Sequence, residues 1–207
     1  MTFNGQALQD KFVSNILNYK RNGFFVEIGS HDYLKHNNSY YLEKKLDWKG
    51  IMIDMDANCL PNWKKYRNNS IHVINDATKI DYAKLFIDNN VPTNIDYLQI
   101  DLEVNNRSTL DVLEKFDKTI FNNYNFATIT FEHDIYTGNF FNTQEISRQI
   151  FLKRGYVLVF PNVSCKYLGN ECVFEDWYVN PNLVDMEYVN SIKTNQSLNG
   201  NNINYKK

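Results

Sequence analysis

The sequence has few cysteines, few prolines and no apolar run long enough to span a membrane, which needs about 20 residues. Its first residues also lack the basic and then apolar pattern of a secretion signal. The three cysteines, Cys59, Cys165 and Cys172, do not have the spacing of a zinc site. We therefore expect reduced thiols rather than a disulfide framework, and a soluble cytoplasmic protein.

An excess of one charge is missing too. The chain carries 22 Lys and Arg residues against 24 Asp and Glu residues, a formal net charge of −2. That balance argues against a broad basic face, so we expect no nucleic-acid partner. A length of 207 residues with 43% apolar residues suits one domain with a sizeable core. We expect this domain at 1–190, with a helical lead-in at about 5–22, and a polar, disordered tail at 191–207.

Short apolar runs alternate with helical patterns along the chain. The expected strands are 24–28, 51–53, 71–74, 97–100 and 126–131, followed by a final pair at 156–160 and 173–179. Apolar residues at helical spacing separate most of the first five strands. Five strand-then-helix units followed by a strand pair predict an α/β fold with a doubly wound, mostly parallel sheet.

Polar or acidic residues follow each of the first five expected strands. They are Gly29-Ser30-His31-Asp32, then Asp54, Asp76, Asp101, and finally Glu132-His133-Asp134. Parallel strands end at one edge of the sheet, and open α/β sheets bind their ligands there. The repetition therefore predicts a site built from these five strand ends.

The glycine turn after the first strand indicates which ligand this site takes. Gly29 stands alone in an acid-rich turn, whereas a dinucleotide fingerprint needs three glycines around a pyrophosphate. An acidic turn suits an ammonium group, such as the methionine end of S-adenosylmethionine. Asp54 is then placed to accept both ribose hydroxyls, and Asp76, beside Ala77, to accept from the adenine amino group. Asp54 also fits an NAD-type oxidoreductase, which remains the alternative.

Seven stretches occur in a characteristic order: FVEIGSHD at 25–32, NS at 38–39, LEK at 42–44, WKGI at 48–51, DYLQIDLE at 96–103, TFEHD at 130–134 and FEDWY at 174–178. Over about residues 9–181 the chain resembles the FkbM-type S-adenosylmethionine-dependent methyltransferases. The resemblance implies a Rossmann-like class I methyltransferase fold with an antiparallel last strand, and O-methylation of small molecules, often sugars. The family commonly has a second glycine after the turn acid, where this chain has Tyr33.

The resemblance and the strand ends together give a set of cofactor-binding residues. That set is Glu27, Gly29, Ser30, Asp32, Asp54, Asp76, Ala77 and Asp101. The residues of the turn would border the methionine moiety. Asp54 would bind the ribose and Asp76 the adenine.

Transfer of a methyl group to a hydroxyl needs in-line alignment and removal of the hydroxyl proton. His133 is the expected general base because an unperturbed histidine has a pKa near 6.5. Glu132 and Asp101 are the expected catalytic carboxylates beside it. Side-chain alternation points Glu132 and Asp134 to one face and His133 to the other. The expected substrate contacts are Glu103, Asp134 and Tyr136.

The remaining expectations concern partners. The acceptor is expected to be a small molecule, a sugar or nucleotide sugar, and a homo-oligomer is left open. A divalent cation such as Mg²⁺ on Asp101, Glu132 and Asp134 is also left open, and no metal site is assigned. A non-catalytic nucleotide-binding module and a metal-dependent hydrolase are further functions that these residues would allow. The basic cluster of Lys64, Lys65 and Arg67 is expected on the solvated face of a helix.

Overall fold

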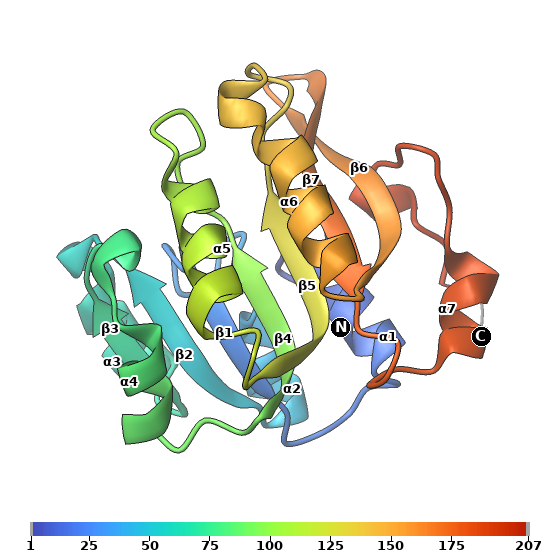
Figure 1. The fold of residues 1–207 in the computed structure, drawn as a ribbon. Helices are drawn as coiled ribbons and strands as arrows, with labels where there is room; N and C mark the ends of the chain where they lie inside the picture. The colour runs from blue at the N-terminus through green and yellow to red at the C-terminus, as the bar shows by residue number, and fades with distance from the viewer. Residues whose placement is uncertain (1, 206–207) are drawn as a thin grey trace.

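The computed structural model describes residues 2–205 and has a central seven-stranded sheet (Figure 1). The strands are β1 (Phe24–Ile28), β2 (Lys49–Asp54), β3 (Ser70–Ile74), β4 (Asn94–Ile100), β5 (Asn125–Glu132), β6 (Val157–Tyr167) and β7 (Asn170–Val179). Their order in the sheet is β3-β2-β1-β4-β5-β7-β6. The first five strands pair in parallel, and β7 lies antiparallel to both β5 and β6. The predicted fold class, a Rossmann-like methyltransferase sheet with an antiparallel final strand, is confirmed.

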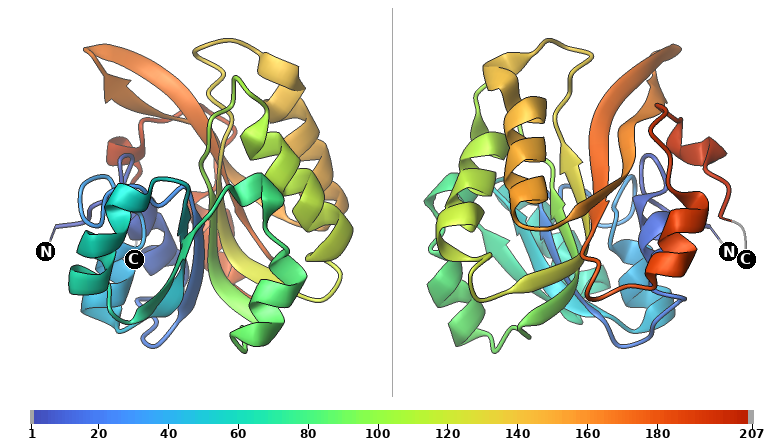
Figure 2. Two further views of the ribbon diagram at one scale, coloured as in Figure 1. Left: turned by 90° about the vertical axis from the view of Figure 1, so that its left-hand side faces the viewer. Right: turned by 45° about the vertical axis from the view of Figure 1, so that its right-hand side comes forward.

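Helices cover both faces of the sheet (Figure 2). One face carries α1 (Gln9–Ile16), α2 (Tyr40–Leu46), α3 (Leu60–Tyr66) and α7 (Met186–Ile192), and the other carries α4 (Tyr82–Asp88), α5 (Ser108–Thr119) and α6 (Thr143–Lys153). Because side chains alternate along a strand, β1 contributes Val26 and Ile28 to the core under α4–α6, and Phe25 to the core under α1–α3. Burial on both faces explains the continuous apolar runs.

Residues 191–205 correct the expectation of a disordered tail. A short 3₁₀ turn, Gly200–Asn202, follows α7, and Ile203 is only 4% exposed. Gly200 packs so closely on the chain that a β-carbon there would stand 2.1 Å from the carbonyl oxygen of Ala7. Leu198 and Tyr205 also join the core beside α1. These apolar residues are irregularly spaced, so a periodicity test misses them. Residues 206–207 of the expected tail lie outside the described residues.

The other global expectations have simple outcomes. The three cysteines are free thiols. Within the part of the chain that the structure describes, no helix combines the length and the apolar character needed to cross a membrane. The lead-in helix α1 is shorter than the expected 5–22.

Candidate functional site

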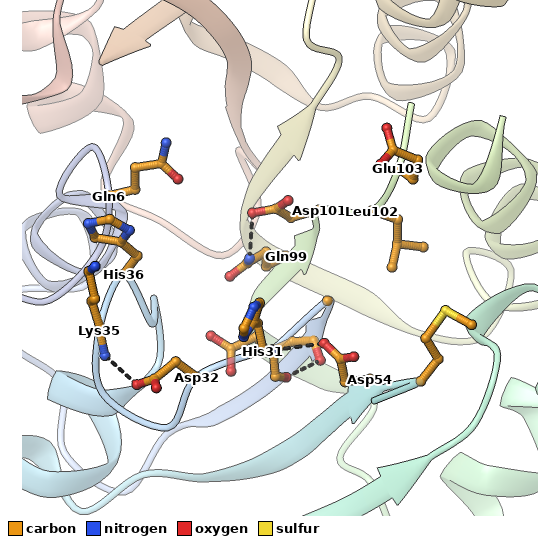
Figure 3. Close-up of a pocket in the computed structure, with 14 residues that line it drawn as sticks. Gln6, His31, Asp32, Lys35, His36, Asp54, Gln99, Asp101, Leu102 and Glu103 are labelled. Atoms are coloured by element: carbon orange, nitrogen blue, oxygen red, sulfur yellow. Dashed lines mark hydrogen bonds between the residues drawn. The ribbon is translucent and has the colours of Figure 1, made fainter. Parts of the chain in front are cut away.

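A pocket of about 650 Å³, here called the main pocket, lies at the carboxyl ends of the parallel strands (Figure 3). Its volume falls within the range of about 300–1,000 Å³ that small-molecule sites occupy. It is lined by the turn after β1, the ends of β2 and β4, and the segment before α1. Of the residues predicted from the sequence, it brings together Glu27, Gly29, Ser30, Asp32, Asp54, Asp101 and Glu103.

The turn after β1 is fixed by its backbone. Gly29 has a φ of 89°, in the left-handed region, and the N–H groups of Gly29 and Ser30 both donate to the carbonyl of Ile53. The Ser30 hydroxyl donates to the Glu27 carbonyl and accepts from the Ile53 N–H. Ser30 therefore positions the turn through its side chain, while the backbone faces the main pocket.

Glu27 is a buried acid whose carboxylate is fully engaged. Its Oε1 accepts from the N–H groups of Asn38 and Ser39, and its Oε2 accepts from Asn37 Nδ2 and Ser39 Oγ at 3.1 and 2.8 Å. Burial raises the pKa of Glu27, and the positive charge of Arg67 opposes that rise. This carboxylate therefore fastens the loop 30–39, which walls the main pocket.

Arg67 corrects the prediction of a solvated basic helix face. Its side chain is fully buried, and Nε donates to Oε2 of the equally buried Glu43 at 2.8 Å. The other guanidinium nitrogens donate to Asn37 Oδ1 and Ser39 Oγ, both at 2.7 Å. The planar fork of arginine thus ties α2 to the same loop that Glu27 holds.

Asp54 ends β2 and faces the main pocket. One carboxylate oxygen accepts from the His31 N–H at 2.8 Å and the other from the Asp56 N–H at 2.9 Å. The carboxylate therefore joins the ends of β1 and β2, and both of its oxygens are held by backbone N–H groups. The exposed Met55 and the half-buried Leu102 add apolar surface to the walls.

Asp32 shapes its own turn. Its Oδ1 accepts from the N–H groups of Leu34 and Lys35 at 2.8 and 2.7 Å. Burial opposes ionisation of Asp32, but these hydrogen bonds dominate and lower its pKa. Tyr33, at the position where FkbM-type sequences commonly have a glycine, stacks on Tyr66 at 4.6 Å between ring centroids and does not line the main pocket. The substitution therefore leaves the main pocket open.

Asp76 and Ala77 do not line the main pocket, and their place beside the adenine stays a prediction. Asp76 accepts from the N–H and hydroxyl of Thr78 at 3.0 and 2.7 Å and from Lys79 Nζ at 2.9 Å. The Thr78 hydroxyl and the Lys79 ammonium lower the pKa of Asp76 to about 2. The carboxylate caps the 3₁₀ turn Ala77–Lys79, and Ala77 is buried in the core. The acid here serves local structure.

Asp101 and Glu132 form a hydrogen-bonded carboxyl pair at the ends of β4 and β5. Burial raises the pKa of both groups, and the rise is larger for Glu132, where the charge of Asp101 adds to it. Gln99 Nε2 donates to Asp101 Oδ2 at 3.2 Å and stabilises the charged form. A proton shared by the pair therefore resides on Glu132, which donates to the Asp101 carboxylate.

Asp134 and Tyr136 extend the same region beyond β5. Burial, together with the charges of Asp101 and Glu103, raises the pKa of Asp134 to about 6. Burial and the charge of Asp134 raise the pKa of Tyr136 to about 12. Tyr136 is 45% exposed, and its N–H donates to the carbonyl of Val173 on β7. Neither residue lines the main pocket, but the carboxyl group of Asp134 belongs to the Asp101–Glu132 cluster.

His133 points away from this cluster, as side-chain alternation predicts. It is 1% exposed, and its Nδ1 accepts from the N–H of Ile135 at 3.3 Å. Its Nε2 lies 3.1 Å from the amide of Gln144 and 3.6 Å from Asp176 Oδ1. Both ring nitrogens therefore face groups of the protein itself. In this arrangement the His133 ring does not line the main pocket, and its role as general base stays a prediction.

Several pocket residues are missing from the set of site residues that the sequence predicts. They are Gln6, His31, Lys35, His36, Met55, Gln99 and Leu102. The sequence could have indicated Gln99, because it precedes Asp101 by two positions and its side chain therefore points to the same face of β4. Gln6 and His36 had none, because the isolated bridge between Gly5 and His36 joins segments distant in sequence. Among residues 2–205, no three His, Cys, Asp or Glu side chains are arranged to hold a metal ion.

Comparison with known proteins supports the fold. No family model and no curated protein matches the sequence. Solved structures do match: precorrin-6y C5,15-methyltransferase from Geobacter metallireducens has 12% identity and a TM-score of 0.52, covering 82% of this chain and 86% of that one. A TehB-like SAM-dependent methyltransferase from Corynebacterium glutamicum has 12% identity and a TM-score of 0.50, with coverage of 86% and 89%.

A third similar structure contains a ligand. Aeropyrum pernix fibrillarin, in complex with natively bound S-adenosyl-L-methionine, has 8% identity and a TM-score of 0.52, covering 86% of this chain and 75% of that one. At these identities the likeness concerns the fold alone. The chain therefore has the class I methyltransferase fold, and its chemistry must be argued from its own pocket.

Proposed function

We propose that this protein is an S-adenosylmethionine-dependent methyltransferase. The observation that carries the proposal is the charge of the main pocket, whose walls include five carboxyl side chains but one lysine. The carboxyl groups are those of Glu27, Asp32, Asp54, Asp101 and Glu103, and the lysine is Lys35. Such walls favour a ligand with cationic groups and repel a pyrophosphate, which argues against an NAD-type oxidoreductase.

The residues present fit the cofactor. Asp54 would accept from the ribose hydroxyls, and Met55 and Leu102 would hold the adenine ring in place of Asp76. The backbone at Gly29 and the carboxylate of Asp101 would border the methionine end. When bound, S-adenosylmethionine supplies a methyl group on a positively charged sulfur, which makes the group an electrophile. The acidic walls stabilise that charge.

The Asp101–Glu132 pair takes the role of proton acceptor that the sequence suggested for His133. A carboxyl pair whose pKa values are raised by burial can accept a hydroxyl proton near neutral pH. Asp134, with its pKa of about 6, is the adjacent group that can pass the proton to solvent. His133 then acts as a positioning residue for the segment after β5.

The acceptor is a small molecule, with a sugar or nucleotide-sugar hydroxyl as our proposal. This part of the proposal rests on the resemblance to the FkbM-type family. It also rests on the near balance of acidic and basic residues in the sequence, which does not favour a nucleic-acid acceptor. We also propose a single methyltransferase domain, which extends beyond the expected 1–190 because Leu198, Ile203 and Tyr205 pack in the core beside α1.

Equilibrium dialysis with radiolabelled S-adenosylmethionine tests the proposal. We expect saturable binding of one molecule per chain, displaced by S-adenosylhomocysteine and unaffected by NAD. Glu132→Gln and Asp101→Asn should retain that binding and reduce methyl transfer by about 10²–10⁴-fold, the usual contribution of a general base. Displacement by NAD, or no saturable binding by a folded protein, would overturn the proposal.

A further inference from the structure

A second pocket, of about 640 Å³, adjoins the main pocket. Its walls are the β6–β7 hairpin near Lys166 and Glu171 and the C-terminal segment 197–202. Gln6 lines both pockets, so the two cavities meet at its side chain. Figure 3 shows Gln6 across the main pocket from Leu102, with Asp101 between them.

The position of Gln6 is fixed by its surroundings. Gly5 forms a bridge with His36, and the backbone of Ala7 packs on Gly200. The side-chain nitrogen of Gln6 donates to Cys165 Sγ at 3.2 Å. Its amide oxygen has no partner among residues 2–205 and is available as a hydrogen-bond acceptor where the two pockets meet.

The walls of the second pocket are polar but almost neutral. Apart from Leu198, they carry amides, a hydroxyl, and Lys166, which stands opposite Glu171 in the strand register. Hydrogen bonds from Ser164 and Asn199, together with the charge of Lys166, lower the pKa of Glu171. The backbone N–H of Asn202 donates to the Asn199 carbonyl at 2.8 Å, whereas its side-chain amide makes no hydrogen bond within the described residues. Amides, together with one lysine and one glutamate whose charges balance, match a neutral ligand rich in hydroxyl groups better than a phosphate or an ammonium group.

The order of the strand ends along the main pocket also indicates where an acceptor would bind. Asp54, the proposed ribose ligand, lies at the end of β2, and Asp101 lies at the end of β4, two strands along the sheet. A cofactor extended from Asp54 to Asp101 therefore has its methyl group on the side of β4 and β5. Gln6 and Asp101 both line the main pocket, and Gln6 also lines the second pocket.

We propose that the second pocket binds the acceptor, and that this acceptor is a neutral saccharide held by Asn202 and by the Gln6 amide oxygen. This inference rests on the proposed function, because only a methyltransferase has a methyl acceptor, but it concerns a cavity other than the main pocket. Gln6 orients one hydroxyl toward the Asp101–Glu132 pair. The C-terminal segment is therefore part of the substrate site.

Saturation-transfer NMR with maltose as the probe tests this site, with choline and glucose 6-phosphate as charged comparators. Asn202→Trp fills the second pocket from an exposed position, and Asn123→Trp adds the same ring at an exposed position just before β5 begins. We expect saturation of maltose by the wild type and by Asn123→Trp, and at least a fivefold loss in Asn202→Trp. Gln6→Ala should weaken the signal as well.

Titration of the same proteins with S-adenosylhomocysteine keeps the two proposals separate. Asn202→Trp should bind it within twofold of the wild type, which also shows that the variant is folded. A maltose signal that persists in Asn202→Trp, a wild type that saturates only the charged probes, or no maltose signal at all would overturn the saccharide site. Failure of the wild type to bind S-adenosylhomocysteine would instead overturn the proposed function.

Discussion

The carbonyl oxygen of Asp101 lies 1.7 Å from the point where a β-carbon on residue 29 would stand. Gly29 therefore allows the turn after β1 to press against the end of β4, and this contact brings the two strand ends into one pocket. The left-handed φ of 89° at this residue is a second, independent reason for a glycine there. One glycine thus serves both the turn and the close approach.

Gly29→Ala should destabilise the fold and weaken cofactor binding. Gly155→Ala is a matched control, because Gly155 has a φ of 84° but open space around its β-carbon position. The control should lose about 1–2 kcal/mol from backbone strain alone. Gly29→Ala should lose a further 1–3 kcal/mol or so from overpacking. Urea unfolding measures both values, and equal losses would contradict the contact with Asp101.

Arg67→Met should be strongly destabilising. It removes the buried guanidinium from the Glu43 carboxylate, which keeps only Lys44 and the Ser70 hydroxyl, and it releases the loop that Glu27 holds. Loss of one partner from a buried ion pair typically costs about 3–5 kcal/mol. Lys64→Met on the exposed face of α3 should change the free energy of unfolding by less than about 0.5 kcal/mol. Denaturant unfolding of the two variants makes the comparison. Similar small effects would contradict a buried ion pair.

Arg67 also shows where sequence reasoning fails. Its position just after Lys64 and Lys65 predicts a place on the same solvated helix face. However, α3 ends at Tyr66, so Arg67 lies beyond the helix, and its side chain is buried. The strand ends were predictable, because buried apolar runs stop at polar residues and parallel strands end on one edge. Whether an acid there binds a ligand or caps a turn was not predictable. Asp54 and Asp76 both follow a strand, but Asp76 is held by its sequence neighbours Thr78 and Lys79, whereas tertiary structure brings the His31 N–H to Asp54.

Glu175 predicts a pH dependence of stability. It is fully buried near Asp101 and accepts from Gln9 and Trp177, and burial raises its pKa to about 8. Because the folded state holds this proton more tightly than the unfolded state, its stabilisation is complete below the unfolded pKa of 4.5. It is then lost as pH rises to about 8. The free energy of unfolding should fall by on the order of 1 kcal/mol per pH unit in that window.

Glu175→Gln removes one titrating proton and should make this fall shallower, while Asp10 and Asp134, with pKa values raised to about 7 and about 6, still contribute to it. The exposed Glu145→Gln should follow the wild type. Urea midpoints across the range from about pH 5 to about pH 8 give the comparison. Parallel curves for Glu175→Gln and the wild type would contradict the assignment. Asp76 and Asp176, whose pKa values are lowered to about 2, lose their stabilisation only in acid, below this window.

His133→Ala should loosen the segment after β5 without removing cofactor binding. The change deletes the acceptor of the Ile135 N–H and a contact to Asp176, so we expect a loss of about 1–3 kcal/mol. Hydrogen exchange should accelerate at residues 134–142. Affinity for S-adenosylhomocysteine should stay within threefold. A tenfold loss of affinity at unchanged stability would place the ring in the cofactor site instead.

The central claim is that the main pocket binds an adenosyl sulfonium cofactor through Asp54. Calorimetric titration with S-adenosylhomocysteine tests it most directly, using the wild type, Asp54→Ala and Asp56→Ala, with NAD run alongside. Asp56 is the control, because it caps the neighbouring 3₁₀ turn and does not line the main pocket. We predict binding by the wild type and Asp56→Ala, a loss of at least about tenfold in Asp54→Ala, and no heat with NAD. A folded wild type that binds NAD, or that does not bind S-adenosylhomocysteine, would contradict the account.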